Sequence, residues 1–457
     1  MEYDDFIKSK HIQSKTTGFD CNAFPDAMFP FQKAAVNFAC RVGKAALFED
    51  CGLGKTLQQL AWADAVCNHT SGRALILAPL LVAPQTVEEG RRFGIELEYA
   101  RKPGNARITI TNYEMMEHFN PDDYSAVVLD ESSILKNFMG KTKQRLIEMF
   151  SRTPYRLACT ATPAPNDYLE LGNHAEFLGV MPSNEMISRW FINDTMSAGS
   201  YRLKRHAESS FWQWVSSWAV CIEKPSDVGF SDDGYDLPPL TVEMSIVDEE
   251  ITPDDDSLFA GNKLSSSNRH KSQRQTAEAR AAKCAEIARA DSSRCIIWID
   301  TNYEGDAMKS AIPESIEIRG NDSIEKKESR MKSFLDGDNP YLVTKASIAG
   351  FGVNLQCCNR IVYTGVTYSY EDFYQAVRRC WRFGQLNPVN VTVVCSSGES
   401  SIFAAIQRKM TDHQKMKRGM ADAMKDWQIT DRRMLSEVKN ADESGENYHI
   451  MQGDCCQ

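Results

Sequence analysis

The sequence predicts an α/β protein in which two parallel-sheet domains follow each other, with a helical insertion between them. Three observations predict this fold class. Short, nearly continuous apolar runs, typical of strands covered on both faces, occur in both halves of the chain. Segments with a helical pattern alternate with these runs. From about residue 181 to residue 275 this alternation stops.

The first domain is expected over residues 1–180. Helix-like stretches such as Thr56–Asn68 and Lys141–Phe150 separate its apolar runs. Four of these runs predict strands, namely Ala45–Glu49, Ala74–Ala78, Ala126–Asp130 and Tyr155–Thr160. We therefore expect a parallel sheet with helices on its faces.

The middle segment, residues 181–275, is expected to be a helical insertion and a linker, because it ends in a polar, Ser- and Asp-rich stretch. Its aromatic cluster runs from Trp190 to Trp218 and is close in sequence to three cations, Arg202, Lys204 and Arg205. These residues could stack on bases or line a DNA groove. A Trp-rich helical pair that packs on itself is the favoured alternative.

The second domain is expected over residues 276–418. It starts with a helical pattern over Ala277–Arg289. Four further apolar runs predict strands, namely Cys295–Asp300, Tyr341–Thr344, Arg360–Thr364 and Val389–Cys395. Residues 419–457 are polar and charged, so we expect a loosely ordered tail.

Composition excludes several classes of protein. A chain of 457 residues is long enough for two or three domains. Its 52 basic and 62 acidic residues give a net charge of −10, which excludes a uniformly basic nucleic-acid wrapper and leaves room only for a local basic groove. No apolar run is long enough to cross a membrane, and the acidic N-terminus is unlike a signal peptide.

The cysteines indicate a reducing compartment. All 14 are scattered, without a C-x-x-C pair or His at zinc spacing. Cys159, Cys295 and Cys395 lie in apolar surroundings typical of a core. We expect reduced thiols in a cytoplasmic protein, without a structural zinc site.

The strongest motif is Glu49–Thr56, which follows an apolar run and opens a helical pattern. In a phosphate-binding loop, residues such as Gly52 and Gly54 let backbone N–H groups approach phosphate oxygens. Lys55 supplies a cation for the phosphates, and Thr56 supplies a hydroxyl for Mg²⁺. Glu49 occupies the place of the usual first glycine. A chance surface turn is the alternative, but the context favours nucleotide binding.

A second motif ends the run Ala126–Asp130 with two carboxylates, Asp130 and Glu131. At the carboxyl edge of a parallel sheet such residues face a ligand crevice. Asp130 suits the Mg²⁺ shell, and Glu131 suits the polarisation of an attacking water. The alternative is a strand that ends in two solvated acids.

A third motif, Gln375–Gln385, contains Arg379 and Arg382. Residues three apart share a face if the segment is helical. Two guanidinium groups on one face can stabilise a γ-phosphate in the transition state. The alternative is an exposed basic helix.

These segments, taken in order, resemble the motifs of superfamily two helicases. The order is FEDCGLGKT, LILAPLLV, ITNYE, VVLDES, ACTATP, TKASIAGFGVNL and QAVRRCWRFGQ, and the resemblance covers about residues 25–415. The sequence looks most like the Swi/Snf branch of ATP-dependent DNA translocases. This resemblance implies two RecA-like lobes that bind ATP and Mg²⁺ in the cleft between them, with nucleic acid across both lobes.

The resemblance also implies roles for single residues. Gln32 would recognise adenine beside a loop that includes Leu53, while Gly352 and Asn354 would border the nucleotide on the second lobe. Arg379 and Arg382 would be arginine fingers. Coupling of hydrolysis to movement would involve Thr160, Thr162 and Gln375, and the nucleic-acid backbone would meet Pro79, Thr111, Asn112, Thr344 and Lys345. For this last set, burial or a strand cap is an equally available explanation.

The sequence departs from the family pattern at the acid box, which reads Asp-Glu-Ser-Ser instead of ending in His. The contact made by that histidine must be replaced or missing, and Ser132 or Ser133 could supply a hydroxyl bond in its place. Gln85 and Thr86 also stand where many relatives have a Gln-Trp pair.

The sequence therefore predicts an ATP-hydrolysing motor that moves along double-stranded DNA without sequence preference. Three alternatives stay open: a helicase acting on single strands or RNA, a nucleotide-gated DNA-binding scaffold, and a motor subunit for a nuclease or methyltransferase.

Overall fold

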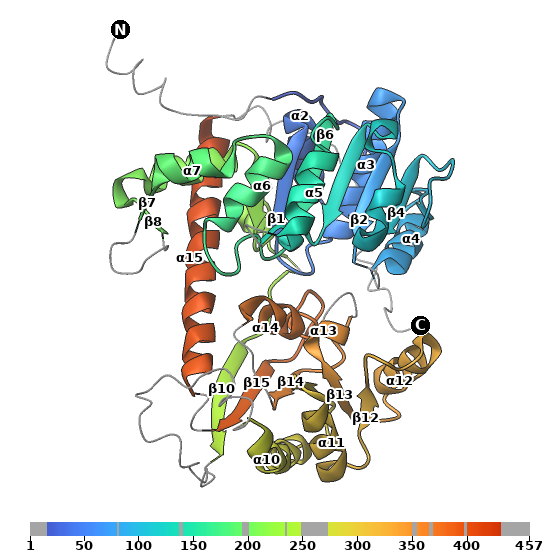
Figure 1. The fold of residues 1–457 in the computed structure, drawn as a ribbon, viewed down its shortest axis with the longest axis vertical. Coiled ribbons are helices and arrows are strands. Elements are labelled where there is room, and N and C mark those ends of the chain that lie inside the picture. The colour runs from blue at the N-terminus through green and yellow to red at the C-terminus, as the bar shows by residue number, and fades with distance from the viewer. Residues whose placement is uncertain are drawn as a thin grey trace. The chain divides into compact units, whose positions relative to one another are not determined.

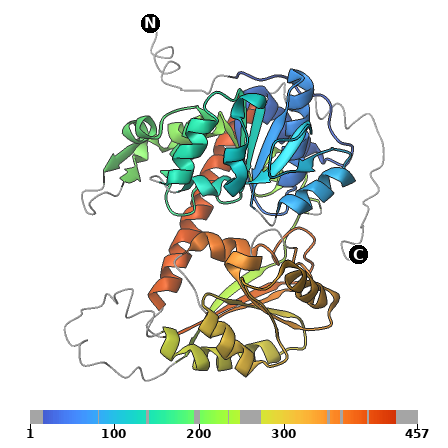
Figure 2. The same cartoon turned by 45° about the vertical axis from the view of Figure 1, so that its right-hand side comes forward.

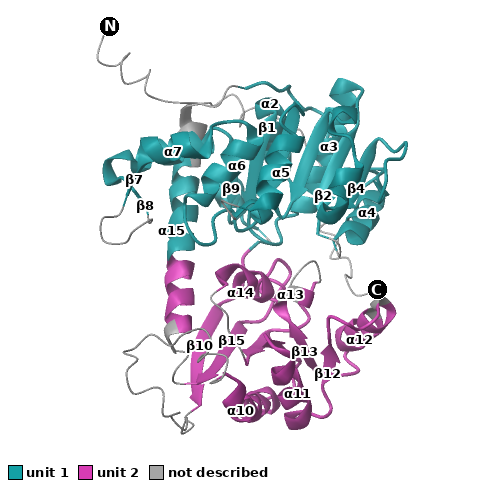
Figure 3. Ribbon diagram, viewed as in Figure 1, with its two compact units in different colours: residues 1–235, 412–451 teal, residues 236–411, 452–457 magenta. Residues whose placement is uncertain are grey.

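The computed structural model describes residues 16–79, 82–136, 140–193, 201–233, 235–247, 273–349, 354–364, 369–396 and 400–430. These residues form two compact units, shown in different colours in Figure 3. Unit 1 takes the described residues up to 235 and those from 412 onward, and unit 2 takes those from 236 to 411.

The sheet of unit 1 has seven parallel strands in the order β3-β4-β2-β5-β6-β1-β9. Four of them are the strands that the apolar runs predicted. The bounds are β1 Lys44–Glu49, β2 Ala74–Ala78, β3 Glu98–Tyr99, β4 Ile108–Asn112, β5 Ala126–Asp130, β6 Tyr155–Cys159 and β9 Ala219–Ile222.

Helices cover both faces of this sheet (Figure 1). Parallel strands are joined by right-handed crossovers, so the direction of each step along the sheet fixes the face on which the connecting helix lies. The steps from β1 to β2 and from β5 to β6 run in opposite directions, which places α3 and α5 on opposite faces. The helices are α2 Pro30–Val42, α3 Lys55–Thr70, α4 Ala83–Arg92, α5 Lys141–Met149, α6 Glu170–Leu178, α7 Ser183–Trp190 and α8 Glu208–Ser216.

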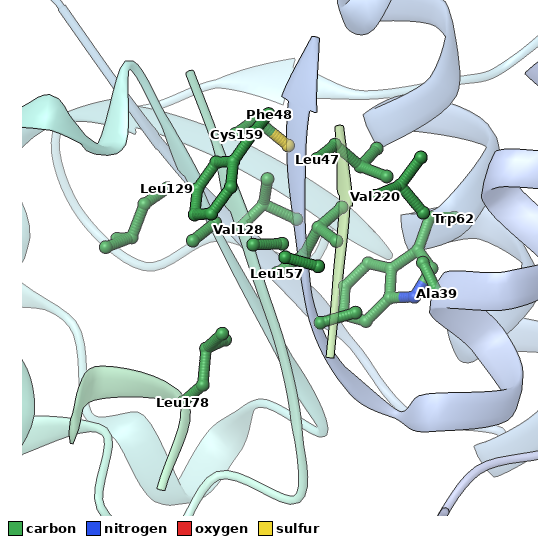
Figure 4. Packing of buried hydrophobic residues seen from close by; sticks show 14 of the residues in the cluster. Ala39, Leu47, Phe48, Trp62, Val128, Leu129, Leu157, Cys159, Leu178 and Val220 are labelled. Carbon is green, nitrogen blue, oxygen red and sulfur yellow. The ribbon is translucent and has the colours of Figure 1, made fainter. Parts of the chain in front are cut away.

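The core of unit 1 sits where these helices meet the sheet (Figure 4). Leu47, Val128 and Leu157 come from three adjacent strands and are fully buried. Trp62 of α3 and Leu178 of α6 are buried against the sheet as well. Burial on both faces explains why these strands read as continuous apolar runs and not as an alternation.

The aromatic cluster of the middle segment packs on itself in unit 1. Trp190 and Trp214 are stacked with ring centroids 4.7 Å apart, and Trp218 is fully buried. The favoured packing interpretation is therefore confirmed. Beside this cluster, β7 (Phe191–Asn193) and β8 (Tyr201–Leu203) form a small antiparallel pair.

The sheet of unit 2 has six parallel strands in the order β10-β15-β14-β11-β13-β12. All four predicted strands are present, together with β10 and β12. The bounds are β10 Leu240–Val247, β11 Cys295–Ile299, β12 Ile316–Ile318, β13 Tyr341–Lys345, β14 Arg360–Tyr363 and β15 Val389–Ser396.

Two separate apolar clusters fill the two faces of this second sheet. Ile296 and Trp298 point into the cluster of α12 and α14, whereas Cys295 and Ile297 point into that of α10 and α11. Figure 2 shows α10 and α11 packed together on their face of the sheet. The helices are α10 Ala277–Arg289, α11 Asn302–Ala311, α12 Ile324–Asp336, α13 Ala346–Ala349, α14 Tyr370–Val377 and α15 Ser400–Thr430.

The division into units differs from the predicted domain boundaries. The predicted insertion, residues 181–275, supplies β9 to the first sheet and β10 to the second. The chain passes from one unit to the other at residues 235 and 236. β9 has only four residues, and apolar and polar residues alternate along most of β10, so neither gives the long continuous apolar run of a central strand.

The predicted tail also differs. Helix α15 continues to Thr430, and Met416 and Met420 are buried in the core of unit 1, so a loosely ordered tail does not begin at residue 419. The reason is the spacing of these two methionines by four residues, which gives an otherwise charged segment one apolar stripe. Residues 431–457 lie outside the described part of the chain.

Two expectations about chemistry can be checked here. Cys159, Cys295 and Cys395 are buried free thiols, as predicted. None of the helices in the described ranges is both long enough and apolar enough to cross a membrane.

Candidate active site

The motif residues of unit 1 meet because three strands end side by side. β5, β6 and β1 are neighbours and parallel, so their carboxyl ends lie at one edge of the sheet. Asp130 is in register with Cys159, and Cys159 is in register with Leu47. The phosphate loop, the acid box and the segment after Cys159 therefore start next to one another, which is where open α/β sheets bind ligands.

The phosphate loop has the backbone geometry that its glycines permit. Gly52 has a φ of 92° and Gly54 a φ of 80°, both in the region that other residues rarely adopt. A Cβ atom on Gly54 would lie 2.4 Å from Gln32 Nε2. The loop then opens α3, whose first residue is Lys55. The N-terminal end of a helix attracts anions.

Lys55 and Gln32 both bond to the phosphate loop itself. Lys55 Nζ donates to the carbonyl oxygens of Glu49 at 2.8 Å and Asp50 at 3.0 Å. Gln32 Nε2 donates to the carbonyl oxygen of Leu53 at 2.8 Å, and its Oε1 accepts from the backbone N–H of Phe29 at 2.9 Å. The structure thus places Gln32 against the loop, with its amide engaged in holding the loop, and its adenine-recognition role stays a prediction.

Glu49, the residue in place of the usual first glycine, is completely buried. Burial raises the pKa of its carboxyl to about 7, against the opposing effect of the Lys55 charge. Gln58 Nε2 donates to Glu49 Oε2 at 2.6 Å and to the Leu53 carbonyl oxygen at 3.2 Å. Sequence reasoning missed Gln58; its position one turn after the loop was the available signal.

The acid box lies beside the TATP segment. Burial, followed by the neighbouring charge of Glu131, raises the pKa of Asp130 to about 7, and the Lys55 charge opposes this shift. Thr160 Oγ1 donates to Glu131 Oε2 at 3.3 Å and accepts from the Thr162 backbone N–H at 3.1 Å. The TATP segment, which the resemblance linked to coupling, is therefore joined to the acid box by a hydrogen bond.

The acid box is also held from helix α6. The turn η3 (Ser132–Lys136) begins one residue after Glu131. His174 of α6 is completely buried, with its Nε2 3.1 Å from Ser132 Oγ. Neither the spacing nor the composition of α6 marked His174 as a site residue.

In unit 2 the two arginines do not share a helical face. α14 ends at Val377, and the residues from Arg378 to Phe383 form turns. The Arg378 guanidinium lies over the Trp381 ring at 4.8 Å, and Trp381 Nε1 donates to the Pro238 carbonyl oxygen at 2.7 Å. These contacts hold the segment in a compact turn, which corrects the helical geometry assumed for Arg379 and Arg382.

Arg379 nevertheless lies beside another motif of unit 2. Its carbonyl oxygen accepts from the Leu355 backbone N–H at 3.0 Å, one residue after Asn354. Gln385 Nε2 donates to the carbonyl oxygens of Gln356 at 2.9 Å and Cys380 at 3.2 Å. Gln385, which sequence reasoning did not select, thus ties the arginine turn to the Asn354 segment.

Of two further predicted site residues in unit 2, the structure describes Gln375 but not Gly352. The predicted site residue Gly352 lies outside the described residues. Gln375 is buried on α14, and within the described ranges its side-chain amide has no hydrogen-bond partner. The coupling role of Gln375 stays a prediction.

Most of the predicted nucleic-acid contacts are buried. Thr111 and Thr344 are completely buried, and Thr344 Oγ1 donates to the Ile318 carbonyl oxygen at 3.0 Å. Asn112 is also buried and donates to Glu114 Oε2 at 2.5 Å. For these three residues the alternative explanation, burial inside a sheet, replaces the expected side-chain contact. Pro79 and Lys345 are half-buried at the ends of β2 and β13.

Fold and site together define a protein with two RecA-like parallel-sheet units, the first of which carries a phosphate loop and an acid box at one sheet edge. Comparison with known families agrees with this class. Residues 279–384, in unit 2, match the helicase conserved C-terminal domain.

The sequence of this chain is similar to those of two known proteins. The chain is 23% identical to YwqA of Bacillus subtilis (strain 168), described as an ATP-dependent helicase/translocase, over 85% of this chain and 48% of YwqA. It is 30% identical, over 32% of this chain and 21% of the relative, to the SWI/SNF-related matrix-associated actin-dependent regulator of chromatin subfamily A-like protein 1 of Drosophila melanogaster. The chain therefore spans about half of the first relative and a fifth of the second.

Among solved structures, a fragment of an HsdR subunit of a type I restriction enzyme from Vibrio vulnificus YJ016 has a related fold. Its TM-score is 0.53 at 16% sequence identity, with 81% of this chain and 64% of the fragment covered. This likeness concerns the fold alone. The chain resembles the Swi/Snf-like superfamily two helicases, as the order of its motifs predicted.

Proposed function

We propose that this chain is an ATP-dependent nucleic-acid motor that hydrolyses ATP to move along double-stranded DNA. The observation that carries the proposal is the convergence of the phosphate loop, the acid box and the TATP segment at one edge of the first sheet. In this proposal Lys55 would contact the phosphates, and Glu131 is the group best suited to polarise the attacking water.

The residues present also fit a magnesium ion. Mg²⁺ is held in such sites by one or two protein oxygens and completed by substrate phosphates and water. Asp130 and Thr56 offer a carboxylate and a hydroxyl of the required hard type. Mg²⁺ would neutralise charge that develops on the phosphate oxygens.

We further propose that Arg379 and Arg382 contribute to hydrolysis. Two guanidinium groups can stabilise the charge of a transferring phosphoryl group. The link between the Arg379 carbonyl oxygen and the Asn354 segment supports this role, because it joins two motifs that the family resemblance assigns to nucleotide contact.

Double-stranded DNA is the proposed track because the relatives that this chain resembles include Swi/Snf-related proteins and a translocase. Pro79 and Lys345, at the carboxyl ends of β2 and β13, are the remaining candidates for backbone contact. If the protein contacts mainly the phosphates of the DNA, it should bind without sequence preference.

The test is a panel of steady-state ATP hydrolysis rates without nucleic acid and with duplex DNA, single-stranded DNA or RNA. We expect duplex DNA to stimulate turnover most, and Lys55→Ala to abolish it. Stimulation by RNA or single strands alone would assign a different track. Negligible turnover with every nucleic acid, in protein that still binds ATP, would favour a nucleotide-gated scaffold.

A further inference from the structure

A histidine lies beside the acid box although it comes from helix α6 and not from the acid box itself. The sequence has serine where the family pattern has histidine, and a contact normally made by an imidazole must be replaced or missing. In the structure an imidazole does lie against this segment. His174 Nε2 is 3.1 Å from the hydroxyl oxygen of Ser132, the residue directly after Glu131.

The proton positions of this pair follow from its second hydrogen bond. His174 Nδ1 lies 3.2 Å from the carbonyl oxygen of Glu170, and a carbonyl can only accept, so Nδ1 carries the proton. Burial lowers the pKa of His174 to about 4, so the ring is neutral near pH 7. Nε2 is therefore an acceptor, and the Ser132 hydroxyl donates to it.

The ring has little freedom to leave this position. His174 is completely buried, and the Phe48 ring meets it edge-on at a centroid distance of 5.1 Å. Phe48 is the strand residue directly before Glu49, at the start of the phosphate-loop motif. The imidazole therefore lies between the strand that leads into the loop and the turn that follows the acid box.

The neighbouring residue of α6 holds the other end of the same turn. Asn173 Nδ2 donates to the carbonyl oxygens of Leu135 at 2.8 Å and Lys136 at 3.2 Å. Two consecutive side chains of α6 thus fix both ends of η3, the turn Ser132–Lys136.

Such support matters because the backbone of Glu131 is strained. Its φ of 55° is left-handed, a region that is unfavourable for a residue with a Cβ atom. A strained conformation persists only where the surrounding structure holds it. Thr160 bonds to the Glu131 carboxylate, and the Ser132–His174 bond holds the chain one residue further on.

We infer that His174 is a positioning residue for Glu131. His174 acts through the Ser132 hydroxyl, and its imidazole takes the place of the histidine missing from the acid box. This inference rests on the proposed function, in which Glu131 polarises the attacking water. Loss of the bond would let the turn relax and move the carboxylate away from the water, while the phosphate loop keeps its nucleotide.

The first arm of the test is a double-mutant cycle with Ser132→Ala and His174→Ala, read by DNA-stimulated ATP hydrolysis. Each single variant is expected to lower kcat about tenfold with KM for ATP changed less than about twofold, as for loss of an interaction used in the transition state. Because both residues act through one bond, the double variant should be no slower than the worse single variant. His174→Gln should recover part of the rate, since its amide oxygen can accept from Ser132.

A matched control separates positioning from plain destabilisation. Leu171 is a fully buried apolar residue of α6 without a polar side-chain group that could bond to the turn. Leu171→Ala should lower the melting temperature at least as much as His174→Ala and keep the wild-type kcat in folded protein. If His174→Ala lost rate only in proportion to its unfolded fraction, or if the effects of the two single variants simply added, the inference would be overturned.

A second arm does not depend on activity. Nitrogen-15 spectra of histidine-labelled protein, with the His174 signals assigned from His174→Gln, should show a neutral ring protonated on Nδ1, and Ser132→Ala should shift the Nε2 signal. A ring protonated on Nε2 would contradict the inference. If wild-type protein were inactive with every nucleic acid, the proposed function would fail, and these spectra would still decide whether His174 accepts from Ser132.

Discussion

Glu131 has a left-handed backbone, an acceptor bond from Thr160 and a supported turn behind it. Its neighbour Asp130 is buried, and Lys55 is bonded to the phosphate loop. At the scale of single residues, the proposed function separates groups that would bind the nucleotide from a group that would act on water. This separation leads to different outcomes for their variants.

Glu131→Gln is expected to retain ATP binding and lower DNA-stimulated turnover at least about 100-fold, because an amide cannot polarise water as a carboxylate does. Lys55→Ala should instead weaken binding, because it removes the cation of the loop. Fluorescence titration with an ATP analogue and steady-state hydrolysis measure both quantities. Weak binding by Glu131→Gln would contradict the assigned roles.

Glu49 gives a prediction for stability against pH. Its folded pKa of about 7 exceeds its ordinary value of 4.5, so between these values the folded protein holds a proton that the unfolded chain releases. Stability from this group is present below pH 4.5 and is lost as pH rises through about 7, a change of about 3 kcal/mol at 1.36 kcal/mol per pH unit. Wild-type protein should therefore lose more stability than Glu49→Gln between pH 5 and pH 8.

Melting curves of nucleotide-free protein at several pH values test this prediction. Glu88→Gln is the matched control, because the Glu88 side chain is 74% exposed. Its pH dependence should follow that of the wild type. Equal pH dependence of Glu49→Gln and wild type would show that the Glu49 carboxyl is ionised in the folded protein.

At the scale of elements, α15 shows how a distant segment reaches the site region. Lys417 is buried, with its Nζ 3.6 Å from Asp50 Oδ2 in the phosphate-loop motif and 3.4 Å from Glu223 Oε1 after β9. Asp50 Oδ1 in turn accepts from the Cys51 backbone N–H at 2.7 Å. The second part of α15 is thus tied to unit 1 by charge as well as by Met416 and Met420.

Lys417→Met should lower the free energy of unfolding of unit 1 by about 3 kcal/mol, because it leaves two carboxylates without their buried cation. Lys415→Met, an exposed lysine two residues earlier on the same helix, should change it by less than about 0.5 kcal/mol. Urea titrations followed by tryptophan fluorescence compare the two variants. Equal midpoints would mean that the ion pairs contribute nothing.

At the scale of the whole molecule, the strands that lie inside a sheet could be predicted, because burial on both faces leaves a continuous apolar run. The residues that end β1 and β5 could be predicted too, since parallel strands end at one edge. The edge strands β9 and β10 could not, because β9 has only four residues and because apolar and polar residues alternate along most of β10, so neither gives a long continuous apolar run. His174, Lys417 and Gln385 could not either, because tertiary contacts alone bring them to the motif segments.

An acidic molecule that binds DNA through a local groove should bind in a salt-dependent way. With a few phosphate contacts, we expect affinity for duplex DNA to fall about 10- to 100-fold between about 50 and 200 mM monovalent salt, and to change less than about threefold between unrelated sequences. Fluorescence anisotropy with labelled duplexes measures both. Binding that does not depend on salt would exclude recognition of the DNA through its phosphate backbone.

We propose that residues of both units serve one hydrolytic reaction. The most direct test of this proposal is the DNA-stimulated ATP hydrolysis rate of Arg382→Ala, with Arg289→Ala, a half-exposed arginine of the same unit, as the control. We predict that Arg382→Ala binds ATP normally and loses at least about 100-fold of the stimulated rate, while Arg289→Ala keeps it. Full stimulated turnover by Arg382→Ala would contradict a role of unit 2 in hydrolysis.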